Sequence, residues 1–368
     1  MFMNMLPWQT CPEDYEQLFA QKCVQVESDM RPVSLPQAQR FSSSPESYRV
    51  RAEFRIWHDD EDLNYVMFDP ESPRTPVIIS EFAPALEPIR QLMPQLRDYL
   101  KVRPTLRRKL FQAEFMSTTT GERLITLIYH RALDEEWEEA ARVLAEEFGV
   151  SLVGRSRKQK RVIGQDFVTD EFVVNGRSYR YRQYEQSFVQ PNAPVNQKML
   201  NWAWEQSAGC SGDLLELYCG NGNFTLPLAS QYPNVIATEL SKSGTRAALE
   251  NLRANEIENV EVVRLSAEEA SQAMAGVREF RRLALLPKPL SDYDLRTVFV
   301  DPPRAGLDPA TLDCVRQFET ILYVSCNPKT LKENIQALED THHATSFALF
   351  DQFPYTHHIE SAVVLRRS

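Results

Sequence analysis

The stretch LLELYCGNGNFTLPLA, residues 214–229, is a short apolar run that leads into Gly220 and Gly222 and then into residues that can begin a helix. In open α/β sheets, a glycine turn after a strand lets a nucleotide-like ligand approach the backbone closely. The third glycine of the dinucleotide fingerprint is missing, because Phe224 and Thr225 occupy that region. The turn therefore favours a nucleoside ligand without a pyrophosphate.

Glu239 ends the next apolar run, NVIATEL, near the spacing at which an acidic residue binds ribose hydroxyls in such folds. A lone Gly-x-Gly is usually an ordinary tight turn. The preceding strand, the following helix and Glu239 together favour nucleoside binding. S-adenosylmethionine meets these requirements, because it carries a ribose and no phosphate.

The apolar runs after residue 187 alternate with helical segments, which predicts a doubly wound parallel sheet, that is, an α/β fold. The last two runs, TSFALFDQF and SAVVLRR, are joined by a segment too short for a parallel crossover, so we expect the last strand to be antiparallel. The first half alternates like hairpins around residues 59–62 and Gly121 and contains an acidic helix over residues 134–148. We predict two domains, a mixed α+β domain over residues 1–186 and a doubly wound, Rossmann-like domain over residues 187–368.

The composition, 43% hydrophobic and 25% charged over 368 residues, is typical of a soluble globular protein. No apolar run approaches the roughly 18 residues of a membrane span, and the N-terminus lacks the pattern of a secretory signal, so we expect a cytoplasmic protein. The six cysteines show no CxxC pair and no zinc-type spacing, so neither a metal nor an iron–sulfur cluster is expected.

The net charge of −10 argues mildly against a nucleic-acid partner, but local basic runs decide phosphate binding. Two runs, GRSRKQKR (residues 154–161) and RSYRYRQYEQ (residues 177–186), mix cations with aromatic or polar residues. Each alone would usually be a solvated face. The acidic helix is expected to face away from RNA, because carboxylates repel phosphates.

Cys326 lies at the end of an apolar run in LYVSCNPKTL, residues 322–331. Taken alone, a free cysteine is most often a small buried hydrophobe. Asp301 in VFVDPPRAGLD and Glu360 in FPYTHHIE also lie at predicted strand ends, where one pocket can collect all three side chains. His357 and His358 with Glu360 are weak metal-ligand candidates, because no helical frame holds them; packing around the loop is the better interpretation.

The chain resembles the RNA uracil-5 methyltransferase family, and within it the branch that forms ribothymidine in the T-loop of tRNA. Relatives acting on ribosomal RNA commonly carry an extra β-barrel and a cysteine cluster, and this chain shows neither. The resemblance is carried by SPESYRVRAEFRIWHD, KLFQ, QPNAPVNQKML, LLELYCGNGNF, VDPPRAGLD, YVSCNP and DQFPYTHHIE.

The resemblance implies S-adenosylmethionine as methyl donor, uridine 54 of tRNA as target, tmRNA with a T-like arm as a further substrate, and a monomer. It also implies that residues 1–186 form the RNA-binding α+β domain and that residues 187–368 form the Rossmann-like methyltransferase domain. It makes Cys326 the nucleophile and Glu360 the proton acceptor. The remaining residues that it implies are the cofactor contacts Gln190, Tyr218, Asn223, Glu239 and Asp301 and the T-loop contacts Arg55, Phe111 and His130; pattern alone would make Phe111 a core strand residue.

The chemistry requires the same residue types. Carbon 5 of uracil is a weak nucleophile, and a thiolate added to carbon 6 moves electron density onto it. A base must then remove the proton of carbon 5. We expect the site to favour the thiolate of Cys326, with help from the dipole of a helix that begins after Pro328.

Two other function classes each explain part of the sequence. A dinucleotide-dependent oxidoreductase explains the glycine turn and Glu239 but leaves Cys326 and Glu360 without a role. A noncatalytic RNA-binding protein explains the basic runs but needs neither the thiol nor a ribose carboxylate.

Overall fold

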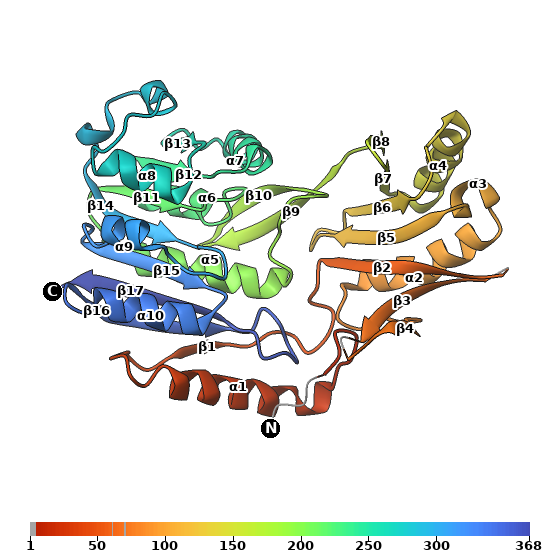
Figure 1. Cartoon of the computed structure of the whole chain (residues 1–368), viewed down its shortest axis with the longest axis horizontal. Helices are drawn as coiled ribbons and strands as arrows, with labels where there is room; N and C mark the ends of the chain where they lie inside the picture. The colour runs from red at the N-terminus through yellow and green to blue at the C-terminus, as the bar shows by residue number, and fades with distance from the viewer. Residues whose placement is uncertain (1–4, 61, 70) are drawn as a thin grey trace. The chain divides into compact units, whose positions relative to one another are not determined.

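The computed structural model describes residues 5–60, 62–69 and 71–368, which form two compact units (Figure 1). The first unit comprises Met1–Glu13, Ser44–Glu171 and Arg182–Ala193, and the second comprises Asp14–Ser43, Phe172–Tyr181 and Pro194–Ser368. The predicted domains have a single boundary after residue 186, whereas these units interleave along the chain. The difference arises because two segments from before residue 186, namely Asp14–Ser43 and Phe172–Tyr181, belong to the second unit.

The second unit contains an eight-stranded sheet with the order β1-β16-β17-β15-β14-β11-β12-β13. Its central strands β11 and β15 are buried at every position, as expected for parallel strands covered on both faces. The elements are α1 (Tyr15–Asp29), β1 (Gln39–Phe41), α5 (Ala193–Ser207), β11 (Asp213–Leu217), α6 (Thr225–Leu228), β12 (Val235–Thr238), α7 (Lys242–Ala254), β13 (Val260–Val263), α8 (Ala267–Met274), β14 (Leu295–Val300), α9 (Pro309–Val315), β15 (Thr320–Ser325), α10 (Pro328–Leu338), β16 (His342–Phe350) and β17 (Glu360–Arg367).

The last strand confirms the predicted antiparallel pairing. β17 lies between β15 and β16 and is antiparallel to both, whereas the other neighbouring strands of this sheet pair in parallel among the described residues. The doubly wound α/β fold is therefore confirmed. The β1 pairing was not predicted, because three residues give no detectable strand pattern.

The first unit contains a seven-stranded sheet with the order β4-β3-β2-β5-β6-β7-β8. β6 and β7 are parallel and are joined through α4, and the other neighbours are antiparallel. The elements are β2 (Arg51–Asp59), β3 (Asp62–Asp69), β4 (Ser72–Ile78), α2 (Glu87–Lys101), α3 (Pro104–Arg107), β5 (Leu110–Ser117), β6 (Arg123–Tyr129), α4 (Glu135–Phe148), β7 (Ser151–Ser156) and β8 (Gln159–Ile163).

A two-stranded ribbon, β9 (Phe167–Val174) and β10 (Arg177–Tyr184), contains residues of both units. Short 3-10 turns occur at Pro12–Asp14, Ala229–Gln231, Leu283–Leu285 and Leu290–Asp292. In the part of the chain that the structure describes, no helix is long and apolar enough to cross a membrane.

The acidic helix α4 shows how local sequence sets the elements of the first unit. The Asp134 carboxylate accepts a hydrogen bond from the Trp137 N–H at 2.9 Å, and Gly149 ends the helix in the left-handed conformation. Trp137 is fully buried. Gly154 on β7 lies so close to the Trp137 ring that a side chain at this position would clash with it.

Candidate active site

Four predicted site residues each follow directly after a parallel strand of the second unit. β11 ends before Tyr218, β12 before Glu239, β14 before Asp301 and β15 before Cys326. The pairings of Leu217 with Thr238 and with Val300 place these strand ends side by side. Because the strands are parallel, the four residues share the carboxyl edge of the sheet, where such folds bind ligands.

The antiparallel strand β17 brings Glu360 to the same edge. Ser325, the last residue of β15, pairs with Ser361 of β17. One step further along this ladder places Cys326 at the level of Glu360. The nucleophile and the proton acceptor implied by the resemblance are therefore brought together by strand register, although 34 positions (360 minus 326) separate them in sequence.

Glu239 is held against the glycine turn. Its carboxylate accepts hydrogen bonds from the Gly220 N–H at 3.1 Å and from the Ser241 N–H at 2.6 Å. A carboxylate has about four lone-pair positions, so acceptor capacity remains for two ribose hydroxyls. At Gly222, φ is +86° and an added Cβ would lie 2.8 Å from Leu226, so the turn requires glycine there.

Tyr218 and Asn223 flank this turn. Tyr218 has a φ of +63°, which is rare for a bulky side chain and is typical of functional sites. The amide of Asn223 exchanges hydrogen bonds with the amide of Asn196, at 2.9 and 3.0 Å. Asn196 lies on α5 and was not singled out from the sequence; it fixes the orientation of a residue implied to contact the cofactor.

Cys326, Asp301 and Glu360 form an acidic cluster. Burial raises the pKa of Glu360 to about 8, with a further contribution from Asp301. Burial also raises the pKa of Asp301 to about 7. The Cys326 thiol has its pKa raised to about 11 by burial and by the negative charges of Glu360 and Asp301. The expectation that the site itself favours the thiolate is therefore wrong for this structure, although α10 does begin at Pro328.

Glu216 is a buried carboxyl group that sequence reasoning missed. It lies on the central strand β11, is 1% exposed, and burial raises its pKa to about 8, with Asp301 adding to the shift. Its Oε2 atom has no hydrogen-bond partner among the described residues. The signal was present in LLELY, because an acidic residue inside an apolar strand is rarely left unpaired.

Gln190 belongs to the first unit. Its Oε1 atom is buried and makes no hydrogen bond within the described residues. This free acceptor is compatible with the ligand contact that the resemblance implies, and the role stays a prediction. The rings of His357 and His358 lie 4.0 Å apart, which agrees with packing around the loop.

Arg55, Phe111 and His130 form one stack in the first unit. The Arg55 guanidinium lies 3.7 Å from the Phe111 ring centroid, and the rings of Phe111 and His130 stack with their centroids 4.0 Å apart and an interplanar angle of 29°. Phe111 is half-buried, and the other two side chains are exposed. Three residues far apart in sequence therefore present a cation–aromatic surface of the kind that binds unstacked bases.

An irregular backbone directs Phe111 into this stack. The pairing of β5 with β6 shifts between Leu110 and Gln112, so Phe111 is the extra residue of a β-bulge. Bulges re-aim side chains next to functional sites. Lys109, two residues earlier, has a φ of +58°, and its carbonyl accepts a hydrogen bond from the His130 N–H at 2.9 Å. The interpretation of Phe111 as an ordinary core residue is wrong.

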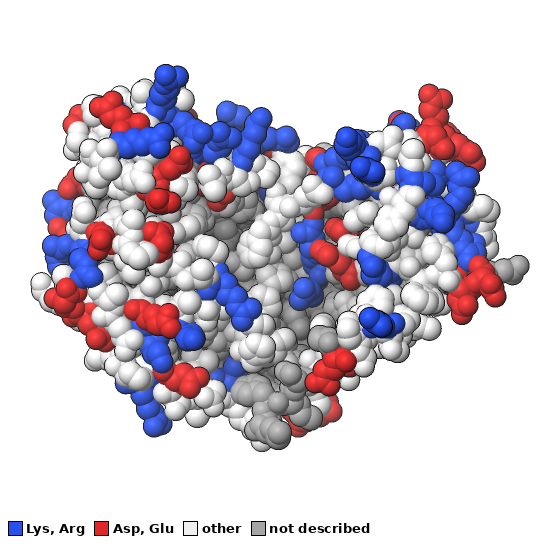
Figure 2. All heavy atoms as spheres, in the orientation of Figure 1, with Lys and Arg blue, Asp and Glu red and all other residues white. Residues whose placement is uncertain are grey.

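A cavity of about 620 Å³ adjoins the stack and is rimmed by cations. Lys101 pairs with Asp62, whereas Arg108 and Lys109 are exposed and have no ion-pair partner among the described residues. Figure 2 shows Lys and Arg atoms over the region of α3, and Asp and Glu atoms at the outer end of α4. The lining residues are Ile56, His58, Asp60, Lys101, Pro104, Arg107, Arg108, Lys109, Leu110, Phe111 and His130.

The predicted basic run of residues 154–161 forms the β7–β8 hairpin, and ion pairs occupy most of its cations. Arg155 pairs with Glu185, Lys160 pairs with Asp166 and Glu185, and Arg161 pairs with Glu138. Arg157 and Lys158 at the tip are exposed and make no ion pair within the described residues. The hairpin thus offers two cations to phosphate instead of the full run.

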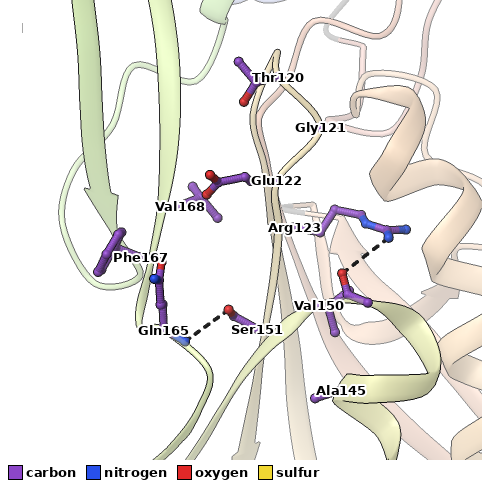
Figure 3. A pocket seen from close by; sticks show the side chains of 11 residues that line it. Thr120, Gly121, Glu122, Arg123, Ala145, Val150, Ser151, Gln165, Phe167 and Val168 are labelled. Atoms are coloured by element: carbon purple, nitrogen blue, oxygen red, sulfur yellow. Dashed lines mark hydrogen bonds between the residues drawn. The ribbon is translucent and has the colours of Figure 1, made fainter.

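A second hollow in the first unit lies beside the turn between β5 and β6 (Figure 3). Its cation is already used, because the Arg123 guanidinium donates to the carbonyls of Phe148 and Gly149 at the end of α4. Glu122 accepts a hydrogen bond from the Thr169 N–H at 2.7 Å. None of the predicted site residues lines this hollow, and Arg123 is the only Lys or Arg among its described lining residues.

Comparison with known proteins agrees with this arrangement. The family model described as tRNA (Uracil-5-)-methyltransferase matches residues 14–368. A protein of Dechloromonas aromatica named tRNA/tmRNA (uracil-C(5))-methyltransferase is 52% identical over 97% of this chain and 98% of its own. A protein of the same name from Pseudoalteromonas atlantica is 48% identical over 99% of this chain and 100% of its own.

Among solved structures, the Pyrococcus abyssi tRNA (uracil-54, C5)-methyltransferase in complex with S-adenosyl-L-homocysteine matches with a TM-score of 0.72. The match covers 95% of this chain and 83% of that chain at 18% identity, so it supports the fold alone. The family model and the two relatives extend over nearly the whole chain. On this evidence, the chain belongs to the tRNA (uracil-5-)-methyltransferase family.

Proposed function

We propose that this S-adenosylmethionine-dependent tRNA uracil-C5 methyltransferase acts on uridine 54 in the T-loop and forms 5-methyluridine through a covalent intermediate on Cys326. The observation that carries the mechanism is the strand register that brings Cys326 and Glu360 to one level of the sheet edge. Neither rival class accounts for this pair. An oxidoreductase needs no thiol there, and a noncatalytic RNA-binding protein needs no buried carboxylates.

S-adenosylmethionine supplies an electrophilic methyl group. Glu239 is the proposed acceptor for its ribose hydroxyls, and the Gly220–Gly222 turn allows close approach of the backbone. The unpaired Oε2 of buried Glu216 fits a ligand that brings its own hydrogen-bond donors. Gln190, Tyr218, Asn223 and Asp301 are the further proposed contacts. No residue of this set calls for a metal.

Catalysis begins with loss of the thiol proton of Cys326. With its pKa raised to about 7, Asp301 is partly ionised at neutral pH and is the proposed acceptor of this proton. The sulfur then forms a bond to carbon 6 of uracil, and the electron pair of the 5,6 double bond moves toward carbon 5 and the neighbouring carbonyl. Carbon 5 thereby becomes nucleophilic enough to accept the methyl group.

Glu360 completes the reaction. After methylation, carbon 5 carries both the methyl group and the original hydrogen. The ionised carboxylate of Glu360 takes this proton, the double bond re-forms, and the carbon–sulfur bond breaks to release Cys326. A pKa raised to about 8 makes Glu360 a stronger base than an ordinary glutamate, at the cost of a smaller ionised fraction at neutral pH.

The T-arm of tRNA is the proposed partner of the Arg55–Phe111–His130 stack. A uracil inside a folded loop must be flipped out, at a cost of roughly a few kcal/mol. Stacking on Phe111 and phosphate contacts to Arg108 and Lys109 are available to offset that cost. A T-like arm in tmRNA offers the same features. We further propose a monomer that acts in the cytoplasm.

The direct test is methylation of tRNA transcripts with labelled S-adenosylmethionine by the purified protein. We expect label in 5-methyluridine at position 54 and none in a transcript with cytidine at that position. Calorimetry should also show binding of S-adenosylmethionine in preference to NAD. Label at another uridine would refute the site assignment, and binding without methylation would refute the activity.

A further inference from the structure

Lys22, in the middle of α1, is a buried lysine whose three donors are all used. It is 3% exposed, and its ammonium group lies 2.5 Å from Asp351 Oδ1. The same group donates to the carbonyl oxygens of Phe353 and His358, each at 3.0 Å. An ammonium group has three N–H bonds, so these three acceptors satisfy it completely.

All three acceptors lie on the segment that leads to Glu360. Residues 351–359 connect β16 to β17, and Glu360 is the first residue of β17. Phe353 and His358 lie near the two ends of this connection. By binding both carbonyls, Lys22 fixes the span between them.

The surrounding contacts show that this connection is held away from relaxed loop geometry. Tyr355 has a φ of +64°, and its ring packs edge-on against Tyr15 of α1 at 5.7 Å. The Tyr15 hydroxyl donates to Asp351 Oδ2 at 2.9 Å. A bulky residue keeps a left-handed backbone only where its surroundings impose it. Here those surroundings include α1.

We propose that Lys22 is a positioning residue for the elimination step, which it serves by holding the 351–359 connection so that Glu360 meets the proton of carbon 5. The proposal rests on the proposed role of Glu360. Lys22 touches no reacting atom and acts through the backbone of Phe353 and His358. Proton transfer is sensitive to such placement, because a shift of about 1 Å can cost roughly 10²-fold in rate.

Two variants distinguish a positioning role of Lys22 from a role in folding alone. Lys22→Met alone would leave the Asp351 carboxylate buried without its cation, so the main variant is Lys22→Met/Asp351→Asn, which removes both charges. Lys22→Arg keeps a cation for Asp351, but a planar guanidinium cannot direct its donors to the same three acceptors. Glu27→Gln is the matched control, because it breaks an ion pair with Arg40 on the exposed side of the same helix.

The experiment measures decay of the covalent protein–RNA adduct after one turnover with S-adenosylmethionine and tRNA, on a denaturing gel, alongside thermal unfolding. We expect adduct decay to slow by up to about 10²-fold in the double variant and in Lys22→Arg, with adduct formation reduced far less. Glu27→Gln should match wild type. A role only in folding would lower the unfolding midpoint and leave the ratio of the two steps unchanged.

Glu360→Gln, run in parallel, distinguishes the two levels of failure. If its adduct persists while folded Lys22 variants release theirs at the wild-type rate, the positioning role is wrong and the proposed function stands. If Glu360→Gln releases RNA normally, another group is the base, and the proposed mechanism fails together with the inference built on it.

Discussion

The sheet edge of the second unit and the Arg55–Phe111–His130 stack of the first unit differ in how far their functional side chains are buried. At the edge, Glu216 and Glu360 are buried and their pKa values are raised to about 8, so desolvation tunes the chemistry. In the stack, Arg55 and His130 are exposed, and they are held by contact with a ring on a bulged strand. Burial thus serves reaction in one region, while exposure serves recognition in the other.

Substitution of Cys326 at the sheet edge should have the largest effect on activity. Cys326→Ala and Cys326→Ser should reduce methylation below detection, because alanine has no nucleophile and a serine hydroxyl ionises far less than a thiol. Binding of S-adenosylmethionine and tRNA should persist, as measured by calorimetry. Substantial turnover by either variant would show that carbon 5 is methylated without covalent addition.

The pH dependence tests whether burial tunes the base. Glu360 acts in its ionised form and has a pKa of about 8, so its ionised fraction falls about tenfold for each pH unit below 8. Because half of Glu360 is ionised at pH 8 and about 1% at pH 6, adduct decay in single turnovers should be about 50-fold slower at pH 6 than at pH 8. A flat profile over this range, or a rate that falls as the pH rises, would contradict the assignment.

Glu216→Gln tests the cost of the buried carboxyl. Its pKa is raised in the folded protein from 4.5 to about 8, so the stability it contributes is complete below pH 4.5 and is lost as the pH rises through 8. Between pH 4.5 and 8, the free energy of unfolding of Glu216→Gln should increase relative to that of wild type by roughly 1.4 kcal/mol for each pH unit. Above pH 8, the difference between the two proteins should stay constant. Denaturant unfolding at pH 5, 7 and 9 measures this, with exposed Glu258→Gln as control; equal slopes for both variants would refute it.

Phe111→Ala tests whether the Arg55–Phe111–His130 stack binds tRNA. Base stacking contributes roughly 1–3 kcal/mol, so the Kd for tRNA should rise by about 5- to 150-fold with no change in affinity for S-adenosylmethionine. The salt dependence should stay the same, because a ring makes no ion pair with phosphate. Arg55→Ala is the contrast, since it should reduce the slope of log K against log salt by about 1. Unchanged tRNA affinity in Phe111→Ala would make the stack a structural feature only.

The smallest expected effect is on the salt dependence of tRNA binding, where cations of the β7–β8 hairpin that make no ion pair are compared with cations that do. Arg157→Ala/Lys158→Ala should reduce the salt slope of tRNA binding by up to about 2. Lys160→Ala/Arg161→Ala changes the net charge equally, but its cations already pair with Asp166, Glu185 and Glu138, so its slope should stay close to wild type. Equal slopes for the two variants would show that the ion pairs do not hold these cations away from RNA.

The parallel sheet and the strand-end residues could be predicted because both depend on local pattern. Buried parallel strands are continuous apolar runs, and each candidate residue directly follows one. Lys22 could not be found in this way, because a lysine in an amphipathic helix normally faces solvent and its partner Asp351 is 329 residues away. The raised pKa of Cys326 and the pairing of the hairpin cations likewise depend on neighbours that sequence does not reveal.

The β1 strand has a consequence for how the protein is made. Its partner β16 is about 300 residues further along the chain, because Arg40 pairs with Leu349. At ordinary translation rates, roughly 15 to 60 s pass between synthesis of these two strands. During that time the N-terminal helix and strand of the second unit have no sheet to join, while the intervening residues of the first unit have all been synthesised. Nascent chains stalled before residue 342 should therefore be sensitive to proteolysis at residues 14–43, and the released chain of 368 residues should be protected there.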